Sequence, residues 1–180
     1  MTARMSLPTL VVVSGAPGVG KTTLAHGLAR RLGCPAVCRD EIKEGMVHAT
    51  PGFVAGVDNS LDLRTLSVFF ETLELFLRAG VTTVAEAAFQ DRLWRPGLTP
   101  LLGLAQLRVV HCVAAPEVAA ERIRQRRNEN RLRRAHSAPG SAVPVGRPFE
   151  RVALDVPSLE VDTAAGYNPS LDEVLAFVNR

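Results

Sequence analysis

The segment 15–22 is the most constraining feature of this sequence, and it reads Gly-Ala-Pro-Gly-Val-Gly-Lys-Thr. It follows an apolar run at residues 10–14 and leads into residues 21–32, whose apolar positions recur at helical spacing. Its three glycines permit backbone conformations in which consecutive N–H groups turn inward around phosphate oxygens. The dipole of the following helix adds positive potential at the same place. The segment therefore predicts a strand–loop–helix unit that binds the phosphates of a nucleotide.

The last residues of this segment predict which ligand is bound. Lys21 can reach the β- and γ-phosphates of a nucleoside triphosphate, and the Thr22 hydroxyl can ligate Mg²⁺. A GTPase is disfavoured, because neither Lys21 nor Lys43, the only lysines in the chain, lies in an N-K-x-D element for guanine recognition. We therefore expect ATP and Mg²⁺ as cofactors. The residues expected to contact them are Gly15, Ala16, Pro17, Gly18, Val19, Gly20, Lys21, Thr22 and Thr23.

The composition is that of an ordinary globular chain. Its 180 residues, 47% of them hydrophobic, fit a single domain over residues 1–180. No apolar run approaches the roughly 18 residues that a membrane span needs, so we expect no membrane partner. The three cysteines, Cys34, Cys38 and Cys112, lack the spacing of a zinc site, and the four histidines share no metal spacing either. Reduced thiols favour a cytoplasmic protein, and we expect a monomer or a homodimer.

Apolar runs alternate with segments of helical period, which predicts an α/β fold with helices on both faces of a parallel sheet. The predicted strands are residues 10–14, 36–38, 81–85, 107–113 and 159–161. The predicted helices are residues 21–32, 40–49, 61–79, 96–106, 116–130 and 170–179, the last with Ser170 as its N-cap. Proline and glycine predict loops at residues 50–60 and 135–158.

Arginines supply nearly all of the positive charge in a chain whose formal net charge is +3. Seven of them fall between residues 122 and 134. Guanidinium groups bind phosphate oxygens in bidentate fashion, so this stretch suits phosphate contacts. It equally suits a nucleic-acid patch or a solvated helix face, and charge alone does not choose among the three.

The order of these features resembles the P-loop kinase-like ATPases, small kinases related to chloramphenicol phosphotransferase, zeta-toxin kinases and the kinase module of polynucleotide kinases. The resemblance rests on residues 15–22, on residues 39–43 (Arg-Asp-Glu-Ile-Lys) after the second strand, on Glu86 after the third strand and on the arginine-rich helix after the fourth. It implies a P-loop NTPase fold, in which helices flank a five-stranded parallel sheet of order 2-3-1-4-5 and a lid spans residues 122–148. The active site would lie at the carboxyl ends of the strands.

The resemblance also implies roles for individual side chains. Asp40 would lie on the acceptor side and take the proton of the substrate hydroxyl, although an aspartate in front of a helical run is also a favoured N-cap. Glu86 would hold Mg²⁺, directly or through water, or contact the acceptor; a solvated strand end is the alternative. Lys43 would bind the acceptor if it projects into the same cleft. Residues 44–70 and 87–100 are expected to form the walls of the acceptor pocket.

Arg122 and Arg126 lie four residues apart and share one face of the predicted helix. The resemblance implies that Arg122 packs on the adenine and that Arg126 or Arg127 reaches the transferred phosphoryl group. An arginine that closes over the γ-phosphate would stabilise the charge on its oxygens. Residues 161–163 and Tyr167 are similar to the wall of the adenine pocket in such kinases, although a turn into the last helix is the interpretation we favour.

The sequence thus predicts an ATP-dependent kinase that transfers the γ-phosphoryl group to a hydroxyl of a small molecule, with Lys21, Asp40 and Arg126 as catalytic residues. One alternative is a kinase of nucleic-acid 5′-hydroxyls, whose affinity would fall steeply with salt. The small number of aromatic side chains available for base stacking (seven Phe, one Trp and one Tyr) disfavours this alternative without excluding it. The other alternative is a switch or regulatory ATPase that binds ATP without an acceptor.

Overall fold

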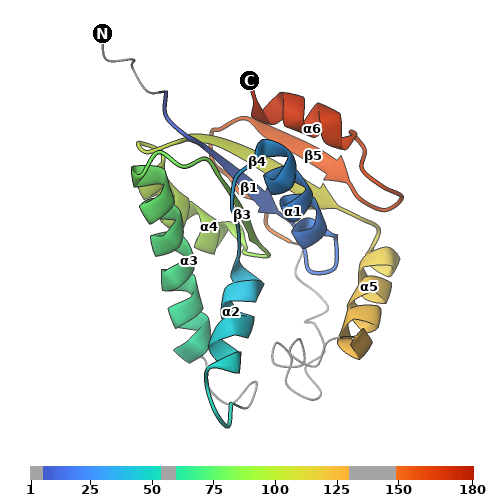
Figure 1. The fold of residues 1–180 in the computed structure, drawn as a ribbon. Coiled ribbons are helices and arrows are strands. Elements are labelled where there is room, and N and C mark those ends of the chain that lie inside the picture. Colours follow the sequence, from blue (N-terminus) through green and yellow to red (C-terminus); the bar gives the residue numbers. More distant parts are fainter. Residues whose placement is uncertain (1–5, 54–59, 130–148) are drawn as a thin grey trace.

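Five strands and six α-helices follow one another along the chain in a computed structural model, which describes residues 6–53, 60–129 and 149–180 (Figure 1). The strands are β1 (Thr9–Ser14), β2 (Ala36–Cys38), β3 (Thr83–Ala87), β4 (Gln106–Val113) and β5 (Ser158–Asp162). The helices are α1 (Lys21–Leu32), α2 (Arg39–His48), α3 (Ser60–Arg78), α4 (Asp91–Leu98), α5 (Pro116–Glu129) and α6 (Leu171–Val178), and a 3₁₀ turn, η1 (Thr99–Leu101), follows α4. Within the described ranges, no helix combines the length and the apolar character that a bilayer span requires.

The five strands form one parallel sheet in the order β2-β3-β1-β4-β5, so the expected P-loop NTPase topology is confirmed. β1 lies in the middle of the sheet, and all of its residues from Leu10 to Ser14 are buried. An uninterrupted apolar run of this kind is typical of a strand that is covered on both faces. Because the strands are parallel, their carboxyl ends meet at one edge, and the loop after β1 leaves the sheet at the centre of that edge.

Side chains of the strands alternate between two cores, one on each face of the sheet. From β1, Val11 and Val13 join the core beneath α1 and α6, whereas Leu10 and Val12 join the core beneath α3 and α4. Figure 1 shows α1 and α6 next to each other over one face, and the two helices are in contact. The place of a strand residue in this alternation therefore decides which helices its side chain meets.

The helix predicted at residues 96–106 is wrong, because α4 begins five residues earlier and ends at Leu98. Its buried residues, Trp94 and Leu98, are four positions apart and lie on either side of Pro96, which is inside the helix rather than at its start. Trp94 packs among three phenylalanines, and the Asp91 carboxylate accepts a hydrogen bond of 2.7 Å from the amide of Ala153. Tertiary contacts of Asp91 and Trp94 thus fix the start of the helix, at residues for which the sequence predicted no element.

The last helix begins where the sequence predicts. Ser170 is the N-cap of α6, and its hydroxyl accepts a hydrogen bond of 3.4 Å from the amide of Glu173. In return, the Glu173 carboxylate accepts a hydrogen bond of 2.8 Å from the amide of Ser170. This reciprocal capping box satisfies two amides that a helix end would otherwise leave without partners.

Replacing Trp94 with alanine should cost the fold a large part of its stability. Trp94 is fully buried, and its ring centroid lies 5.2–6.0 Å from those of Phe69, Phe70 and Phe89. The cavity and the lost contacts should lower the free energy of unfolding by about 3–5 kcal/mol, measured by urea denaturation. Leu75→Ala, at a position of α3 that is 65% exposed, should cost less than about 0.5 kcal/mol. Equal losses in the two variants would contradict this packing.

Candidate active site

The loop that joins β1 to α1 is wedged between the end of β4 and the helix α5. Gly15 and Gly18 have φ angles of +151° and +83°. A Cβ atom at Gly15 would lie 2.4 Å from the carbonyl oxygen of Cys112, and one at Gly18 would lie 2.5 Å from the carbonyl oxygen of Ala119. Neither position therefore accepts a side chain without a backbone shift, which explains the glycines that the sequence pattern contains.

The start of α1 is built to receive an anion. Gly20, the N-cap residue, has a φ of 88° and no side chain with which to cap the helix, and the first turn contains no acidic residue. The first amides of a helix have no partner inside the helix, and the helix dipole places positive potential around them. Phosphate oxygens fit this place, so the residues present suit the polyphosphate of a nucleotide.

Lys21 and Glu86 form a buried pair beside this loop. Lys21 Nζ donates a hydrogen bond of 2.9 Å to the carbonyl oxygen of Ala16 and lies 3.9 Å from Glu86 Oε1. Burial lowers the pKa of Lys21, and the carboxylate of Glu86 opposes this shift. Burial likewise raises the pKa of Glu86, while the charge of Lys21 opposes the shift. Each charged group thus favours the charged form of the other.

Thr22 and Glu86 together offer a pair of oxygen ligands. The Thr22 hydroxyl donates a hydrogen bond of 3.2 Å to Glu86 Oε2. Adjacent ligands of an octahedral Mg²⁺ ion, each at 2.0–2.1 Å from the metal, are about 3 Å apart. The hydroxyl and carboxylate oxygens are therefore close enough to share one Mg²⁺ ion, as the sequence predicted for these two residues.

Glu86 reaches this place because β3 extends two residues beyond its predicted end. The strand runs to Ala87, so Glu86 lies inside it and aligns with Val13 of β1 and Cys38 of β2. Val13 belongs to the core beneath α1, and aligned residues of parallel strands point to the same face. Glu86 therefore faces α1 and is buried, so the alternative of a solvated strand end is wrong.

Asp40 lies in the first turn of α2 and is not its cap. The N-cap of α2 is Cys38, so the alternative role of Asp40 as the N-cap is wrong. The carboxylate of Asp40 accepts a hydrogen bond of 3.0 Å from Arg39 and is exposed. Its charge acts on both Lys21 and Glu86, raising the pKa of each. Asp40 thus shares one electrostatic environment with the phosphate loop.

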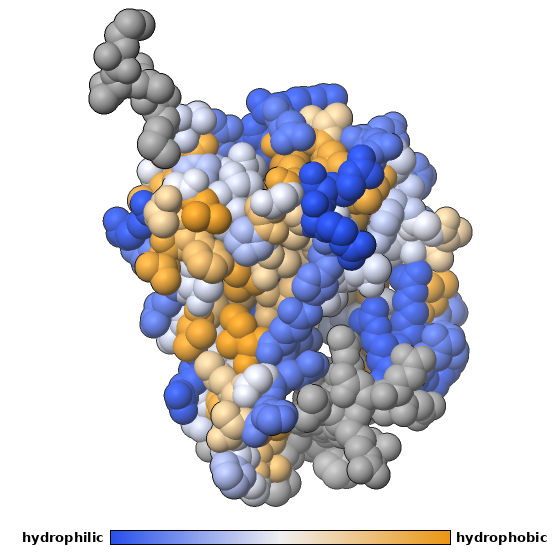
Figure 2. All heavy atoms as spheres, viewed as in Figure 1, coloured by the Kyte–Doolittle hydropathy of each residue, from blue (hydrophilic) through white to orange (hydrophobic). Residues whose placement is uncertain are grey.

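A pocket of about 370 Å³ opens beside Asp40 and has two chemically different ends. Its lining combines the charged residues Arg39, Asp40 and Asp62 with Leu63, Leu66, Ala88, Phe89 and Leu93. Six of these eight residues fall in the stretches 44–70 and 87–100, from which the sequence predicted the acceptor walls, whereas Arg39 and Asp40 precede them. Of the large hydrophobic residues that the structure describes, Leu63 and Leu93 are among those that remain exposed. Figure 2 shows apolar surface on the side of the molecule where α3 lies.

Lys43 lies beneath the charged end of this pocket. Its Nζ is buried and donates a hydrogen bond of 2.8 Å to Asp62, which Arg39 also contacts. Burial alone would raise the pKa of Asp62, but the hydrogen bonds from Lys43 and Arg39 hold it below its ordinary value. The described residues that line the pocket do not include Lys43, so the structure gives its predicted contact with the acceptor no direct support. The sequence analysis missed Asp62, whose only local signal is an acidic residue in the first turn of a helix.

A second pocket, of about 240 Å³, lies on the opposite side of the start of α1. Its lining residues are Gly20, Thr23, Arg122, Arg126, Thr163, Gly166 and Tyr167. The Arg122 guanidinium is held in this wall by hydrogen bonds of 2.7 Å to the carbonyl oxygen of Thr163 and 3.2 Å to its hydroxyl. Asp162 pairs with Asn168, so the chain turns at residues 164–166, and Tyr167 lies in the wall of this pocket. The side chain of Arg127 and residues 130–148 of the expected lid lie outside the described residues.

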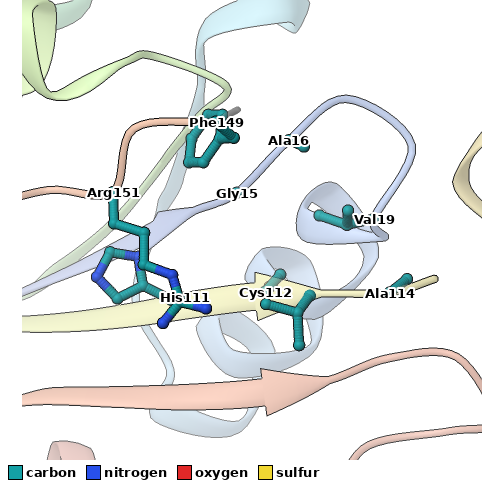
Figure 3. Close-up of a pocket in the computed structure, with 9 residues that line it drawn as sticks. Gly15, Ala16, Val19, His111, Cys112, Ala114, Phe149 and Arg151 are labelled. Carbon is teal, nitrogen blue, oxygen red and sulfur yellow. The ribbon is translucent and has the colours of Figure 1, made fainter. Parts of the chain in front are cut away.

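A third pocket, of about 180 Å³, lies on the β4 side of the phosphate loop (Figure 3). Figure 3 shows His111 and Arg151 at one end and Phe149 near Gly15 at the other. Nδ1 of His111 is buried and has no hydrogen-bond partner among the described residues. Burial lowers the pKa of His111, and the positive charge of Arg151 adds to this shift. The sequence analysis missed this pocket, because no local pattern relates Phe149 and Arg151 to the end of β4.

Residues 10–143 match the family model of the AAA domain. An uncharacterized protein of Mycobacterium tuberculosis is 29% identical to the chain over 133 residues, which make up 67% of this chain and 26% of that protein. The chain thus spans about a quarter of the length of the curated relatives that it matches.

Three solved structures share the fold over nearly the whole chain. A candidate kinase from Chloroflexus aurantiacus has a TM-score of 0.84 at 24% identity, over 97% of this chain and 98% of that one. A sugar kinase from Janibacter sp. has a TM-score of 0.67 at 22% identity, over 96% of this chain and 95% of that one. The APS kinase of Mycobacterium tuberculosis, solved with AMPPNP and APS, has a TM-score of 0.65 at 16% identity, over 96% of this chain and 98% of that one. The P-loop kinase-like fold is therefore established.

The stability of the protein should fall as the pH is lowered through about 6.5, the ordinary pKa of histidine. Because the pKa of His111 is lowered on folding, the unfolded chain binds more protons in this range than the folded chain does. The contribution of neutral His111 to the free energy of unfolding is complete above pH 6.5 and is lost as the pH falls below it. His111→Leu should reduce the slope of unfolding free energy against pH, measured by urea denaturation between pH 5 and 8. The exposed-site variant His48→Asn should keep the wild-type slope, and an unchanged slope in His111→Leu would refute the assignment.

Proposed function

The chain belongs to the AAA domain family, and from this premise we propose that it is an ATP-dependent phosphotransferase, which moves the γ-phosphoryl group of ATP to a hydroxyl of a small molecule. In the balanced reaction, a bond forms between the acceptor oxygen and the γ-phosphorus. The bond from that phosphorus to the β,γ-bridging oxygen breaks. The products are ADP, the phosphorylated acceptor and the proton of the hydroxyl.

One observation carries the proposal: the Lys21–Glu86 pair, the Thr22 hydroxyl and the Asp40 charge converge between two pockets. A protein that only binds nucleotide needs the loop and the pocket beside Arg122. It has no need of a second pocket with a carboxylate at its edge. The acceptor-side pocket therefore favours phosphoryl transfer over a switch or regulatory ATPase.

On the donor side, different residues of the chain would bind different parts of the nucleotide. The pocket beside Arg122 and Tyr167 would take the base, and the amides from residue 15 to residue 23 would bind the phosphates. Lys21 would neutralise charge at the β- and γ-phosphates, and Arg126 would approach the transferred group from α5. Thr22 and Glu86 would hold Mg²⁺, which would supply positive charge to stabilise the phosphate oxygens.

On the acceptor side, Asp40 would accept the proton of the attacking hydroxyl. Arg39 and Lys43 both bond to Asp62, and Arg39 also bonds to Asp40, so the described charges at this end of the pocket balance one another. The other end is apolar, through Leu63, Leu66, Phe89 and Leu93. We therefore propose that the acceptor is a hydroxyl compound without a strong net charge that carries an apolar portion.

Asp40→Asn should abolish transfer and leave ATP binding near normal. The variant retains the shape of the side chain and loses the proton acceptor, which typically contributes about 10²–10⁴-fold to a rate. A panel of hydroxyl compounds, screened for acceptor-stimulated ADP release, would first identify a working acceptor. With that acceptor, kcat should fall at least about 100-fold in Asp40→Asn and stay unchanged in the exposed-site control Asp155→Asn. ADP release that no acceptor stimulates, or a kcat that is unchanged in Asp40→Asn, would contradict the proposal.

The apolar end of the pocket should set acceptor selectivity. Leu63→Ser removes an apolar group at the pocket wall at a position that is 69% exposed, so folding should not suffer. For acceptors with an apolar portion, KM should rise roughly fivefold, equivalent to about 1 kcal/mol of lost contact, with little change for polyols. Leu75→Ser, at an equally exposed position of the same helix outside the pocket, is the matched control. A preference for polyols in the wild type would contradict this acceptor class.

A further inference from the structure

Three side chains of metal-binding type converge outside the groups that the proposed reaction uses. His26 comes from α1, Cys38 from the end of β2 and Glu41 from the first turn of α2. Nε2 of His26 lies 2.7 Å from Glu41 Oε1 and 3.8 Å from Cys38 Sγ. All three donor atoms lie within 4.8 Å of one another. Their spacing in the sequence gives no metal pattern, so only the fold brings them together.

The sheet explains why these residues meet. Cys38 aligns with Glu86, so both side chains point to the face that α1 covers. His26 follows Thr22 by four residues, so it lies on the same face of α1, one turn or about 6 Å along the axis. Thr22 meets Glu86, and His26 meets Cys38 and Glu41, in two successive layers between the helix and the sheet. The cluster is therefore a neighbour of the Thr22–Glu86 pair and shares no donor atom with it.

The donor set selects the class of ion. A thiolate, an imidazole and a carboxylate together suit Zn²⁺, whereas Mg²⁺ prefers oxygen ligands alone. With the usual Zn–ligand distances and tetrahedral angles, sulfur and nitrogen would be about 3.6 Å apart and nitrogen and oxygen about 3.3 Å apart. The separations in the protein are 3.8 Å and 2.7 Å, so the largest adjustment falls on Glu41, whose side chain is 46% exposed. A rotation of the Glu41 side chain would make room for the ion.

We propose that His26, Cys38 and Glu41 form a binding site for one Zn²⁺ ion, whose fourth position is open to solvent. On binding, the Cys38 thiol gives its proton to the solvent and the thiolate ligates the ion. His26 Nε2 and one oxygen of Glu41 complete the protein ligands. An ion held here would join α1 to the start of α2, the turn that carries Asp40.

The electrostatic surroundings of the sulfur support a cation at this place. Burial raises the pKa of Cys38, and the carboxylates of Glu86 and Glu41 raise it further. The negative charges that disfavour an isolated thiolate attract a divalent cation, whose charge then stabilises the thiolate. Cys38 is almost fully buried, while His26 and Glu41 are half exposed, so an ion can enter from solvent and be held at the sulfur.

Titration with Co²⁺ tests the site directly, because thiolate ligation and tetrahedral geometry both give characteristic absorption bands. The experiment uses the full chain without a histidine tag, under reducing conditions and without nucleotide, so its outcome does not depend on kinase activity. We expect Co²⁺ binding to saturate at one ion per chain and to produce a thiolate-to-cobalt absorption band. One equivalent of Zn²⁺ should displace the bound Co²⁺ and remove the band, whereas excess Mg²⁺ should not displace it. Displacement by Mg²⁺ would assign the ion to the Thr22–Glu86 pair and overturn the proposal.

Variants of the chain decide which residues bind the ion. Cys38→Ser should remove the thiolate band, and Cys34→Ser, at the half-buried cysteine outside the cluster, should keep it. His26→Ala and Glu41→Gln should each weaken Co²⁺ binding by at least about tenfold, the smallest loss typical of even an outer-shell partner. Circular dichroism would confirm that each variant is folded. A wild-type protein without the band, or a band that persists in folded Cys38→Ser, would refute the site.

Discussion

The buried pair of Lys21 and Glu86 is the interaction on which the rest of the site depends. Burying two charges is costly, and a pair of this kind persists only where further hydrogen bonds satisfy both groups. Here the Ala16 carbonyl oxygen accepts from Lys21 and the Thr22 hydroxyl donates to Glu86, so the pair ties the phosphate loop, the first turn of α1 and β3 together. The loop is thereby fixed in shape before any phosphate arrives, which reduces the cost of ordering it on binding.

The position of β1 at the centre of the sheet then separates two kinds of pocket. On one side, α5 and the segment after β5 form a polar pocket with Arg122 and Tyr167. On the other side, α2, α3 and the end of β3 form a pocket that is charged near Asp40 and apolar near Leu63. Figure 2 shows the same contrast at the surface, hydrophilic over α5 and apolar toward α3. A donor and an acceptor can therefore approach the loop from opposite directions, which is the arrangement that phosphoryl transfer requires.

Local sequence predicted most of the elements because their signals are local. Gly20 and Gly33 bound α1, Ser170 caps α6, and the apolar run of β1 fits a strand buried on both faces. The exception, α4, depends on Trp94 packing against Phe69 and Phe70 of α3 as well as the nearby Phe89, which no local period can express. The strand order came from the resemblance to a known group of kinases and not from the periodicity of this chain.

For the site, the sequence by itself determined the phosphate loop, because close approach of main-chain amides needs glycines at fixed positions and those glycines are visible in the pattern. The resemblance to a known group of kinases also singled out Asp40 and Glu86. Only the tertiary structure decided that Glu86 faces α1 and that Asp62 contacts both Arg39 and Lys43. It likewise decided that His26, Cys38 and Glu41 meet. These contacts join residues from different elements, and strand register and helix packing, rather than spacing along the chain, set which side chains share a face.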